Sequence, residues 1–507
     1  MIFKKYLLLA LGFTFLAGCA LGPNYKRPDL DLPADVQISA ENYSVFQNYE
    51  WWQMFADDNL NKLEKQALQY NRDLRMAVAR VDQARAGVTS AVADQLPTIG
   101  LQGGSGRAGT YYGSAQTVSS GTIAAAFELD LWGKYRRLSE AARGELLATM
   151  TAKDTVLLSL TSEVATAYFT LRMLDAQLDI ANKTLKTRRE SVRIYNSRYN
   201  AGVIAEVDLR RVEADMYSVE AQAKELELSV RKAETALAVL VGESPREIVA
   251  GAEERSGHLR DVAVLPDVPE HLPAKFLAKR PDVRSAEGEL IAANARIGAA
   301  RAAYFPDISL TGAAGYASNE LDRLFMSPNG IWGVAASVAQ PIFAGGKILA
   351  QNRSAKAKYQ EMLANYEKTV QTAFKEALDA LNANRINREI FDIMLKQTLA
   401  LRRSYELTKK QEDAGLISTM ELLDVERNLL NAEMTLASAR QAELVGLVNL
   451  SKALGGGWDE QCGFGPFEEK LRREQEVAEL EARLQAAEQA AQAAEQAVQA
   501  DTQSSEK

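Results

Sequence analysis

Two very long helical stretches restrict the possible folds more than any other feature of this sequence. Lys347–Asp413 contains neither proline nor glycine, and Tyr135–Arg198 contains no proline and the single glycine Gly144. As helices with a rise of ~1.5 Å per residue, each stretch would extend to roughly 100 Å. The mean helix of a globular protein has only about 11–12 residues. The stretches therefore predict the wall of a tube rather than the interior of a globular domain.

Apolar residues in the first stretch are spaced three and four positions apart, as in the a/d seam of a coiled coil. The seam consists of Leu157, Leu160, Val164, Ala167, Leu171, Leu174, Leu178, Ala181 and Leu185. An amphipathic helix in an ordinary bundle would show the same spacing. The length of the stretch favours the coiled-coil wall.

The two stretches belong to an internal duplication. Ala201-Gly202 recurs 213 residues later as Ala414-Gly415, whereas Pro97 recurs 209 residues later as Pro306. The change of offset places four extra residues in a loop of the second half. A repeat has to be identified before a fold is assigned. From these offsets we expect a first repeat at 59–270 and a second at 271–456. Each would comprise a helix, a β-hairpin and a long helical hairpin, and the first helix would cover Asn59–Ala93.

Each repeat also contains residues that alternate between apolar and small or polar, which is the pattern of β-strands. One such strand ends at Leu129, and another covers Ile331–Ile342. Strands of ~9–11 residues with this alternation are typical of a transmembrane barrel. A soluble sheet covered by helices is the alternative. The face opposite the apolar residues argues against a packed core, because its residues are small or polar and include Glu128 and Asp130.

A bilayer does not tolerate an open sheet edge, and four strands cannot close alone, so several chains have to share one barrel. Three chains give twelve strands, which lies within the known range. The sequence therefore predicts an α+β membrane protein: a trimeric 12-stranded β-barrel with four strands per chain, continued by a long α-helical coiled-coil barrel, with an internal twofold repeat.

The N-terminus has the features of a bacterial lipoprotein signal. Residues 1–18 combine two lysines with an apolar core, and Leu16-Ala17-Gly18-Cys19 resembles the lipoprotein cleavage box. An ordinary signal with an incidental cysteine is the alternative. If the signal is that of a lipoprotein, Cys19 is the first mature residue and carries diacylglycerol and palmitate. These acyl chains would hold the protein on a membrane, because several chains anchor stably where one does not. Residues 19–58 would be a lipid-anchored tether, and Ala20 implies sorting to the outer membrane.

Composition excludes several classes of function. The formal net charge of −8 argues against a nucleic-acid partner, because phosphate contacts require clustered lysine and arginine. With two histidines and two cysteines in the whole chain, neither a metal site nor a histidine-based catalytic group is expected. Ala344–Ile348 lacks the spacing of a nucleotide-binding loop. We therefore expect no enzyme activity and no cofactor other than the acyl groups.

Short motifs along nearly the whole mature chain support a family resemblance. They are Leu16–Cys19, Gly22–Tyr25, Trp51-Trp52, Arg280–Asp282, Phe305-Pro306, Gln340–Phe343 with Gly345-Gly346, and Asp413–Gly415. In order and spacing they resemble the TolC-type outer membrane factor family, in particular the efflux lipoprotein branch typified by OprM and NodT-type proteins. Residues 457–507, a C-terminal equatorial segment with an Ala/Gln/Glu-rich tail, depart from this pattern after about Leu471.

This resemblance implies a homotrimer in the bacterial outer membrane that extends into the periplasm. Its partners would be outer membrane lipid, a periplasmic adaptor of the membrane fusion protein type and an inner-membrane RND-type pump. The channel would be a passive exit duct through which a tripartite efflux system removes small toxic compounds.

The resemblance also implies which residues carry the function. The return helix of the second half would line an aperture, gated by Met420, Asp424 and Arg427. Asp424 and Arg427 lie three positions apart, on one helical face; a solvated helix face is the alternative. The first-half counterpart of Asp424 is Arg211, so only one hairpin would carry the acidic ring. The tips that touch the adaptor would be Gly202, Val203, Gly415 and Leu416.

Two other functions remain open at this point. The same tube could be the exit duct of a type I-like protein secretion system with a different pump. The chain could also be a non-conducting, lipid-anchored coiled-coil scaffold of the envelope, although a scaffold does not explain the alternating hairpins.

Overall fold

The computed structural model describes residues 20–29, 50–109, 115–244, 246 and 280–456. The chain divides into two compact units, Met1–Gly457 and Trp458–Lys507, of which the second lies outside the described residues. The described elements, in chain order, are η2 (Trp51–Phe55), α2 (Asp58–Tyr70), α3 (Arg72–Ala93), β1 (Thr98–Ala108), β2 (Gln116–Leu129), α4 (Lys134–Asn200), α5 (Glu206–Leu240), α8 (Pro281–Ala302), β3 (Asp307–Ser318), η4 (Leu321–Arg323), η5 (Ser327–Asn329), β4 (Gly330–Ala339), α9 (Lys347–Asp413) and α10 (Thr419–Ala453).

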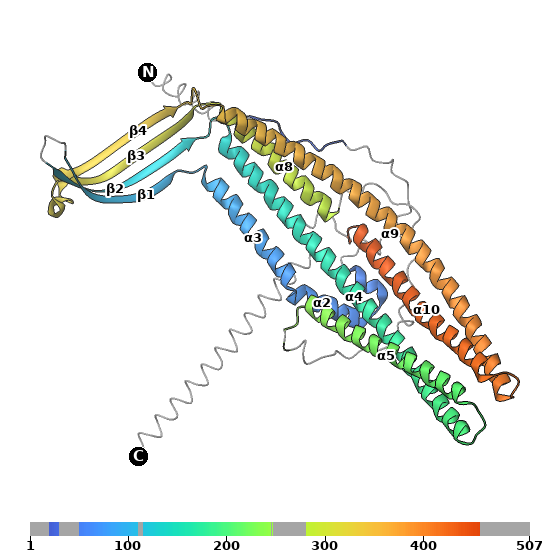
Figure 1. Ribbon diagram of the computed structural model, residues 1–507. Helices are drawn as coiled ribbons and strands as arrows, with labels where there is room; N and C mark the ends of the chain where they lie inside the picture. Colours follow the sequence, from blue (N-terminus) through green and yellow to red (C-terminus); the bar gives the residue numbers. More distant parts are fainter. Residues whose placement is uncertain (1–19, 30–49, 110–114, 245, 247–279, 457–507) are drawn as a thin grey trace, which may run out of the picture. The chain divides into compact units, whose positions relative to one another are not determined.

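The two predicted long helices are confirmed. Helices α4 and α9 each have 67 residues, and the helices that return from them, α5 and α10, each have 35. α4 packs against α5 and α9 against α10, and α10 also packs along α4 (Figure 1). Along the predicted a/d seam, Val164 and Ala181 are completely buried. Among the described helices, none combines the length and the hydropathy that crossing a membrane requires.

The helical stretch expected at Asn59–Ala93 is interrupted at Asn71, which separates α2 from α3. The Asn71 side-chain oxygen accepts a hydrogen bond from the Leu74 amide at 3.0 Å, so it caps the start of α3. Its side-chain amide donates to the Leu240 carbonyl at 2.9 Å, at the end of α5. The helical pattern alone did not locate this break, because one of the two bonds at Asn71 is made to a distant part of the chain.

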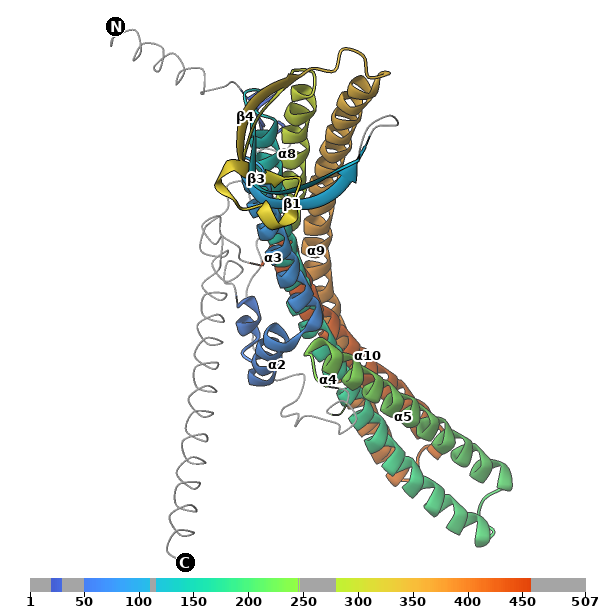
Figure 2. The ribbon, with the colours of Figure 1, turned by 90° about the vertical axis from the view of Figure 1, so that its left-hand side faces the viewer.

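The four strands form one antiparallel sheet in the order β1-β2-β3-β4, as the two hairpins predict (Figure 1). The sheet is curved (Figure 2). The hairpins join through β2 and β3, where Ala125 lies opposite Gly312. Ala125 also pairs with Ile99, and Gly312 with Val334, so one apolar row crosses the whole sheet. β1 and β4 are its outer strands, and the described residues pair nothing with their outer edges.

The strand expected at Ile331–Ile342 is shorter, because β4 ends at Ala339, one residue before Gln340-Pro341. The expectation for Asp130 was wrong: it follows the end of β2 and does not lie on a face of the sheet. Its carboxylate accepts a hydrogen bond from the Arg136 amide at 2.9 Å. Asp130 therefore supplies an anion at the first turn of α4, where amide groups have no helical partner.

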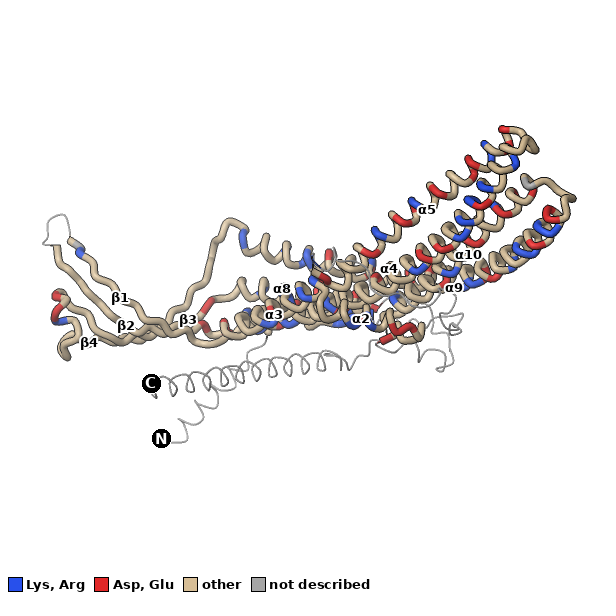
Figure 3. The backbone as a smooth tube through the Cα atoms, turned by 90° about the horizontal axis from the view of Figure 1, so that it is seen from below, with Lys and Arg blue, Asp and Glu red and all other residues tan. Residues whose placement is uncertain are grey.

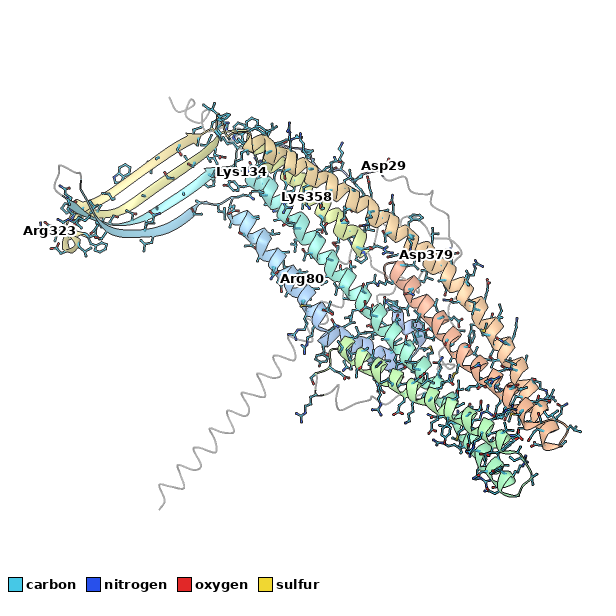
Figure 4. The ribbon with its side chains drawn as sticks, viewed as in Figure 1. Asp29, Arg80, Lys134, Arg323, Lys358 and Asp379 are labelled. Carbon is cyan, nitrogen blue, oxygen red and sulfur yellow. The ribbon has the colours of Figure 1, made fainter. Side chains whose placement is uncertain are left out.

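Charged residues lie at the two ends of the sheet and are sparse between them (Figure 3). Lys134 marks the end that continues into α4, and Arg323 marks the loop at the opposite end (Figure 4). At the helical end, Glu128 accepts hydrogen bonds from Lys134 at 3.0 Å and from the Tyr135 hydroxyl at 2.7 Å. The sheet thus has an uncharged middle band with charges on both sides.

The N-terminal residues lie on the helices next to the sheet. The Leu21 amide donates to the Trp132 carbonyl at 3.1 Å, and Arg137 donates to the Leu21 carbonyl at 3.0 Å. Further along, Arg27 donates two hydrogen bonds to Glu287 of α8, at 2.7 and 2.6 Å. Residues 20–27 are therefore held against α4 and α8.

Glycine permits a close approach between α4 and α8. A Cβ atom on Gly144 would lie 2.8 Å from the Ala292 nitrogen, and one on Gly288 would lie 2.7 Å from the Ala148 nitrogen. Backbone atoms of the facing helix cannot withdraw from such a contact without separating the helices. Gly87 on α3 provides a comparison, since a Cβ atom there would meet nothing within 4 Å.

Replacing Gly144 by leucine should lower the free energy of unfolding by at least the ~1–3 kcal/mol typical of overpacking. Gly87→Ala should be neutral or stabilising by up to ~1 kcal/mol, because alanine has the higher helix propensity. Thermal unfolding followed by the helical circular dichroism signal measures both. Equal transition temperatures for the two variants would contradict the close approach of α4 and α8.

Candidate functional site at the helix tips

The two helical hairpins end in tips with the same backbone geometry. Gly202 and Gly415 follow the ends of α4 and α9 with φ angles of 71° and 72°, a left-handed conformation that favours glycine. The Val203 amide donates to the Arg198 carbonyl at 3.0 Å, and the Leu416 amide donates to the Gln411 carbonyl at 2.9 Å. These bonds close a Schellman motif at each helix end.

The residues that follow the two tip glycines are apolar and point into solvent. Val203 is 71% exposed and Leu416 is 75% exposed. In a Schellman motif the residue at this position usually packs back onto the helix. Here each tip instead presents an apolar side chain, and with Gly202 and Gly415 these are the four tip residues predicted from the sequence.

The return helices α5 and α10 start differently. Ser418 caps α10: its hydroxyl accepts a hydrogen bond from the Glu421 amide at 3.4 Å. Ala205 occupies the same place before α5 and offers no side-chain cap. Capping contributes typically ~1 kcal/mol, so α10 has the more strongly stabilised first turn.

The structure brings together two of the three predicted gate residues. Arg427 donates a hydrogen bond to the Asp424 carboxylate at 2.7 Å, one turn apart on α10. Both side chains are largely exposed in the single chain, at 67% for Asp424 and 59% for Arg427. An exposed ion pair of this kind stabilises a helix by only ~0.3–0.5 kcal/mol, which leaves the Asp424 carboxylate available for other contacts.

Met420, the third predicted gate residue, does not join this pair. It packs on a buried apolar cluster between the hairpins, formed by Tyr195, Leu209, Val212 and Leu423. These residues come from α4, α5 and α10. Met420 therefore fixes the start of α10 against the first hairpin.

Sequence reasoning missed a buried charge cluster two residues beyond Asp424. Arg188 of α4 is completely buried and pairs with Asp215 of α5 at 2.7 Å. Its guanidinium also donates a hydrogen bond to the Glu426 carboxylate of α10. One arginine thus connects three helices and both hairpins. Nothing in the local sequence distinguishes these residues from other surface charges, since only the packing of the helices buries them.

Burial raises the pKa of Glu426 above its usual value; the neighbouring Asp215 raises it further, and Arg188 opposes the shift. Tyr405 of α9 has a raised pKa for the same main reason, burial, and Glu426 adds to it. Lys409, also on α9, favours the charged form of Glu426. All four long helices therefore contribute to the electrostatics at this level of the hairpins.

The described residues offer no cluster of three His, Cys, Asp or Glu side chains that could hold a metal ion. Cys19, the predicted lipid attachment site, lies outside the described residues. What the site offers is a mechanical arrangement: two hairpins joined by a buried charge cluster, with exposed carboxylates and apolar tips at their ends.

Comparison with known proteins identifies the family. The model of the outer membrane efflux protein family matches residues 63–243 and 272–456. Cation efflux system protein CusC of Escherichia coli O6:H1 is 34% identical over 454 residues, covering 88% of this chain and 97% of that protein. The probable outer membrane lipoprotein SilC of Salmonella typhimurium is 31% identical over 466 residues, covering 90% of this chain and 100% of that protein.

A solved structure gives the same result. The crystal structure of the Campylobacter jejuni CmeC outer membrane channel has a TM-score of 0.82 and 27% sequence identity, and the match covers 87% of this chain and 96% of that one. The chain belongs to the outer membrane efflux protein family, which confirms the resemblance drawn from its sequence. It is an efflux channel of the bacterial outer membrane.

Replacing Arg188 by leucine should lower the free energy of unfolding by ~3–5 kcal/mol near neutral pH, because Asp215 and Glu426 lose their buried cation. Burial raises the pKa of Glu426 above its usual value in the folded chain. As the pH falls, the Glu426 carboxyl therefore becomes neutral in the folded chain before it does in the unfolded chain. A neutral carboxyl does not need a buried cation, so the loss of stability caused by Arg188→Leu should shrink. Urea unfolding at about pH 7.5 and about pH 5 measures both effects.

Arg189→Leu is the matched control, because Arg189 is exposed and pairs with Glu220 at 2.8 Å on the surface. Its effect should stay within ~1 kcal/mol at both pH values. Similar losses for the two variants would contradict the structural role of the Arg188 cluster.

Proposed function

We propose that three copies of this chain form one closed conduit. Its outer part is a 12-stranded barrel in the outer membrane, and its inner part is a tube of helical hairpins in the periplasm. It acts as the passive exit duct of a tripartite efflux system for small toxic compounds. The observation that carries the proposal is the four-stranded sheet, which has an apolar face and two outer edges, on β1 and β4, with which no described residue pairs.

The sheet fits the membrane-spanning role. On the apolar face, Leu101, Trp332 and Val334 are each about four-fifths exposed in the single chain, at 82%, 81% and 79%. Such exposure is costly in water and favourable in hydrocarbon. The charges at both ends of the sheet (Figure 4) lie where the polar headgroups would be.

The helical hairpins fit the periplasmic role. The equal lengths of α4 and α9, and of α5 and α10, support two copies of one unit in each chain. Asp424 and Arg427 lie on α10 just beyond the tip, so three chains would present three such pairs around an aperture. The exposed Val203 and Leu416 offer apolar contacts to a periplasmic adaptor, and an inner-membrane RND-type pump would supply the energy.

The N-terminal contacts fit a lipid anchor on Cys19. Ala20 lies against the start of α4, so close that a Cβ atom on Gly133 would be 2.7 Å from the Ala20 Cα. Gly133 is only four residues beyond Leu129, the last residue of β2. Acyl chains on Cys19 would thus start beside the membrane end of the helices, level with the edge of the barrel.

An exit duct for protein secretion would have the same tube but another pump; the family match favours efflux. Conductance in planar bilayers distinguishes the duct from a non-conducting envelope scaffold. A pure trimeric preparation that stays silent even as the Asp424→Ala variant would support the scaffold and exclude the duct.

Reversing the charge at the aperture, by Asp424→Lys, should raise the open probability and conductance in planar bilayers, because Arg427 loses its carboxylate partner and the added like charges of three chains repel one another. Arg211→Asp reverses the charge at the equivalent place on the first hairpin and should leave conductance unchanged. If conductance is unaltered in Asp424→Lys, the pair is a surface feature and not a gate.

Replacing Cys19 by serine should abolish metabolic labelling of the protein with palmitate, because serine offers no thiol for the diacylglycerol and the signal is not processed as a lipoprotein signal. Cys462→Ser, in the same assay, should keep the full label. Label that persists in the Cys19→Ser variant would refute the lipid anchor.

A further inference from the structure

One side chain on the buried face of α2 is poorly suited to its surroundings. Glu64 is completely buried, as are Leu60 and Ala67, which lie one turn away from it on the same face of the helix. Within the described part of the chain, neither carboxyl oxygen of Glu64 has a hydrogen-bond partner. Burying a charged carboxylate without a partner is far more costly than burying the neutral acid. The packed position of α2 therefore favours the protonated form of Glu64.

Contacts at both ends of α2 attach it to the first helical hairpin. At its start, the Tyr168 hydroxyl of α4 donates a hydrogen bond to the Asp57 carboxylate at 2.7 Å, and Asp57 also caps α2. At its end, the Asn71 side chain donates to the Leu240 carbonyl of α5 at 2.9 Å. Between these attachments α2 packs against α4 and η2. The Glu64 carboxyl is thus enclosed in the middle of a segment whose two ends are fixed.

Among the described residues, no charged neighbour takes the place of the missing partner. The ionisable groups on α2, before η2 and on the adjoining part of α4 are Glu50, Asp57, Asp58, Lys62, Lys65, Tyr70, Glu163, Tyr168 and Arg172. None of them shifts the pKa of the Glu64 carboxyl, which burial alone raises well above its usual value. Lys62 and Lys65, the cations closest to it in sequence, are exposed. A proton is therefore what neutralises Glu64.

We propose that Glu64 is a proton-dependent latch that holds α2 on the first helical hairpin. With its proton, the side chain is neutral and α2 stays packed on α4. Without the proton, the carboxylate has to reach water, and α2 separates from α4. The latch concerns packing within one chain, so it goes beyond the proposed function and does not depend on it.

The direction of the pH dependence follows from linkage between proton binding and packing. In the separated form the Glu64 carboxyl is exposed and loses its proton near its usual pKa, whereas burial raises its pKa in the packed form. Between these two values only the packed form keeps the proton, so each increase of one pH unit favours separation by up to about tenfold. Below this range the latch holds at full strength, and above it the effect levels off.

Separation of α2 would also affect the helix that follows it. Asn71 joins α2 to α3, and its side chain both caps α3 and binds the Leu240 carbonyl. α3 packs along α4 and leads into β1. The latch therefore links the pH around the helices to the mobility of α2 and of the first turn of α3.

Thiol labelling of the full-length protein in outer membranes tests the latch. In a Cys462→Ser background, Leu63→Cys places a thiol on α2 at a position that is 4% exposed, where iodoacetamide reaches it when α2 separates. The labelling rate is compared with that after the additional change Glu64→Gln, from about pH 5 to about pH 9. The ratio of the two rates cancels the titration of the thiol itself. It should rise by up to about tenfold per pH unit and then level off.

The matched control is Glu163→Gln in place of Glu64→Gln, because it removes an exposed carboxylate from the neighbouring α4. Its labelling rates should equal those of the Leu63→Cys background at every pH. A ratio for Glu64→Gln that stays constant with pH would overturn the latch.

Amide hydrogen exchange tests the same latch in the unaltered chain. After correction for the intrinsic effect of pH on exchange, α2 should lose protection by up to about tenfold per pH unit, whereas α8 should not. Equal pH dependence of the two helices would refute the latch, and so would a loss of protection in α2 that persists in Glu64→Gln.

Discussion

Unpaired backbone groups at a sheet edge are the constraint on which the proposed assembly depends. In hydrocarbon no water satisfies an exposed amide or carbonyl, and each one left unpaired costs several kcal/mol. The four-stranded sheet has two such edges, on β1 and β4. A ring of identical sheets removes both with one repeated contact. The duplication within the chain has already formed that kind of contact once, between β2 and β3.

The helical part has a different constraint, because long helices packed in water need a specified register. Apolar a/d residues supply most of the burial, but they permit slips along the seam. The buried cluster around Arg188 fixes one arrangement, since its guanidinium has partners on α5 and α10 at a single level. Two buried apolar clusters lie on either side of it along α10: the one on which Met420 packs, and a second one formed by Ala181, Leu185, Val219, Ala223, Leu430 and Met434. The two hairpins of one chain are thereby matched in height, and both tips project apolar side chains beyond the last buried layer.

Periodicity and glycine placement predicted much of the fold. The bounds of α9 coincide with the stretch free of proline and glycine, and the repeated Gly202 and Gly415 follow the ends of α4 and α9 in the left-handed conformation that favours glycine. The candidate site was predicted less completely. Asp424 and Arg427 pair as their spacing suggests, whereas the packing of Met420 depends on Tyr195 and Val212, which are far away in the chain. Asn71 and Arg188 were missed for the same reason.

The sequence by itself determined the two long helices, the two β-hairpins, the glycine tips and the family, because these depend on local propensity, periodicity and short motifs. Only the tertiary structure decided which charges are buried and which helices they connect. Burial is a property of the packed chain: Arg188 and Arg189 are adjacent in sequence, yet one lies in the interior between three helices and the other in solvent. Neighbouring residues on a helix face directions about 100° apart, so packing against α5 and α10 gives them opposite roles.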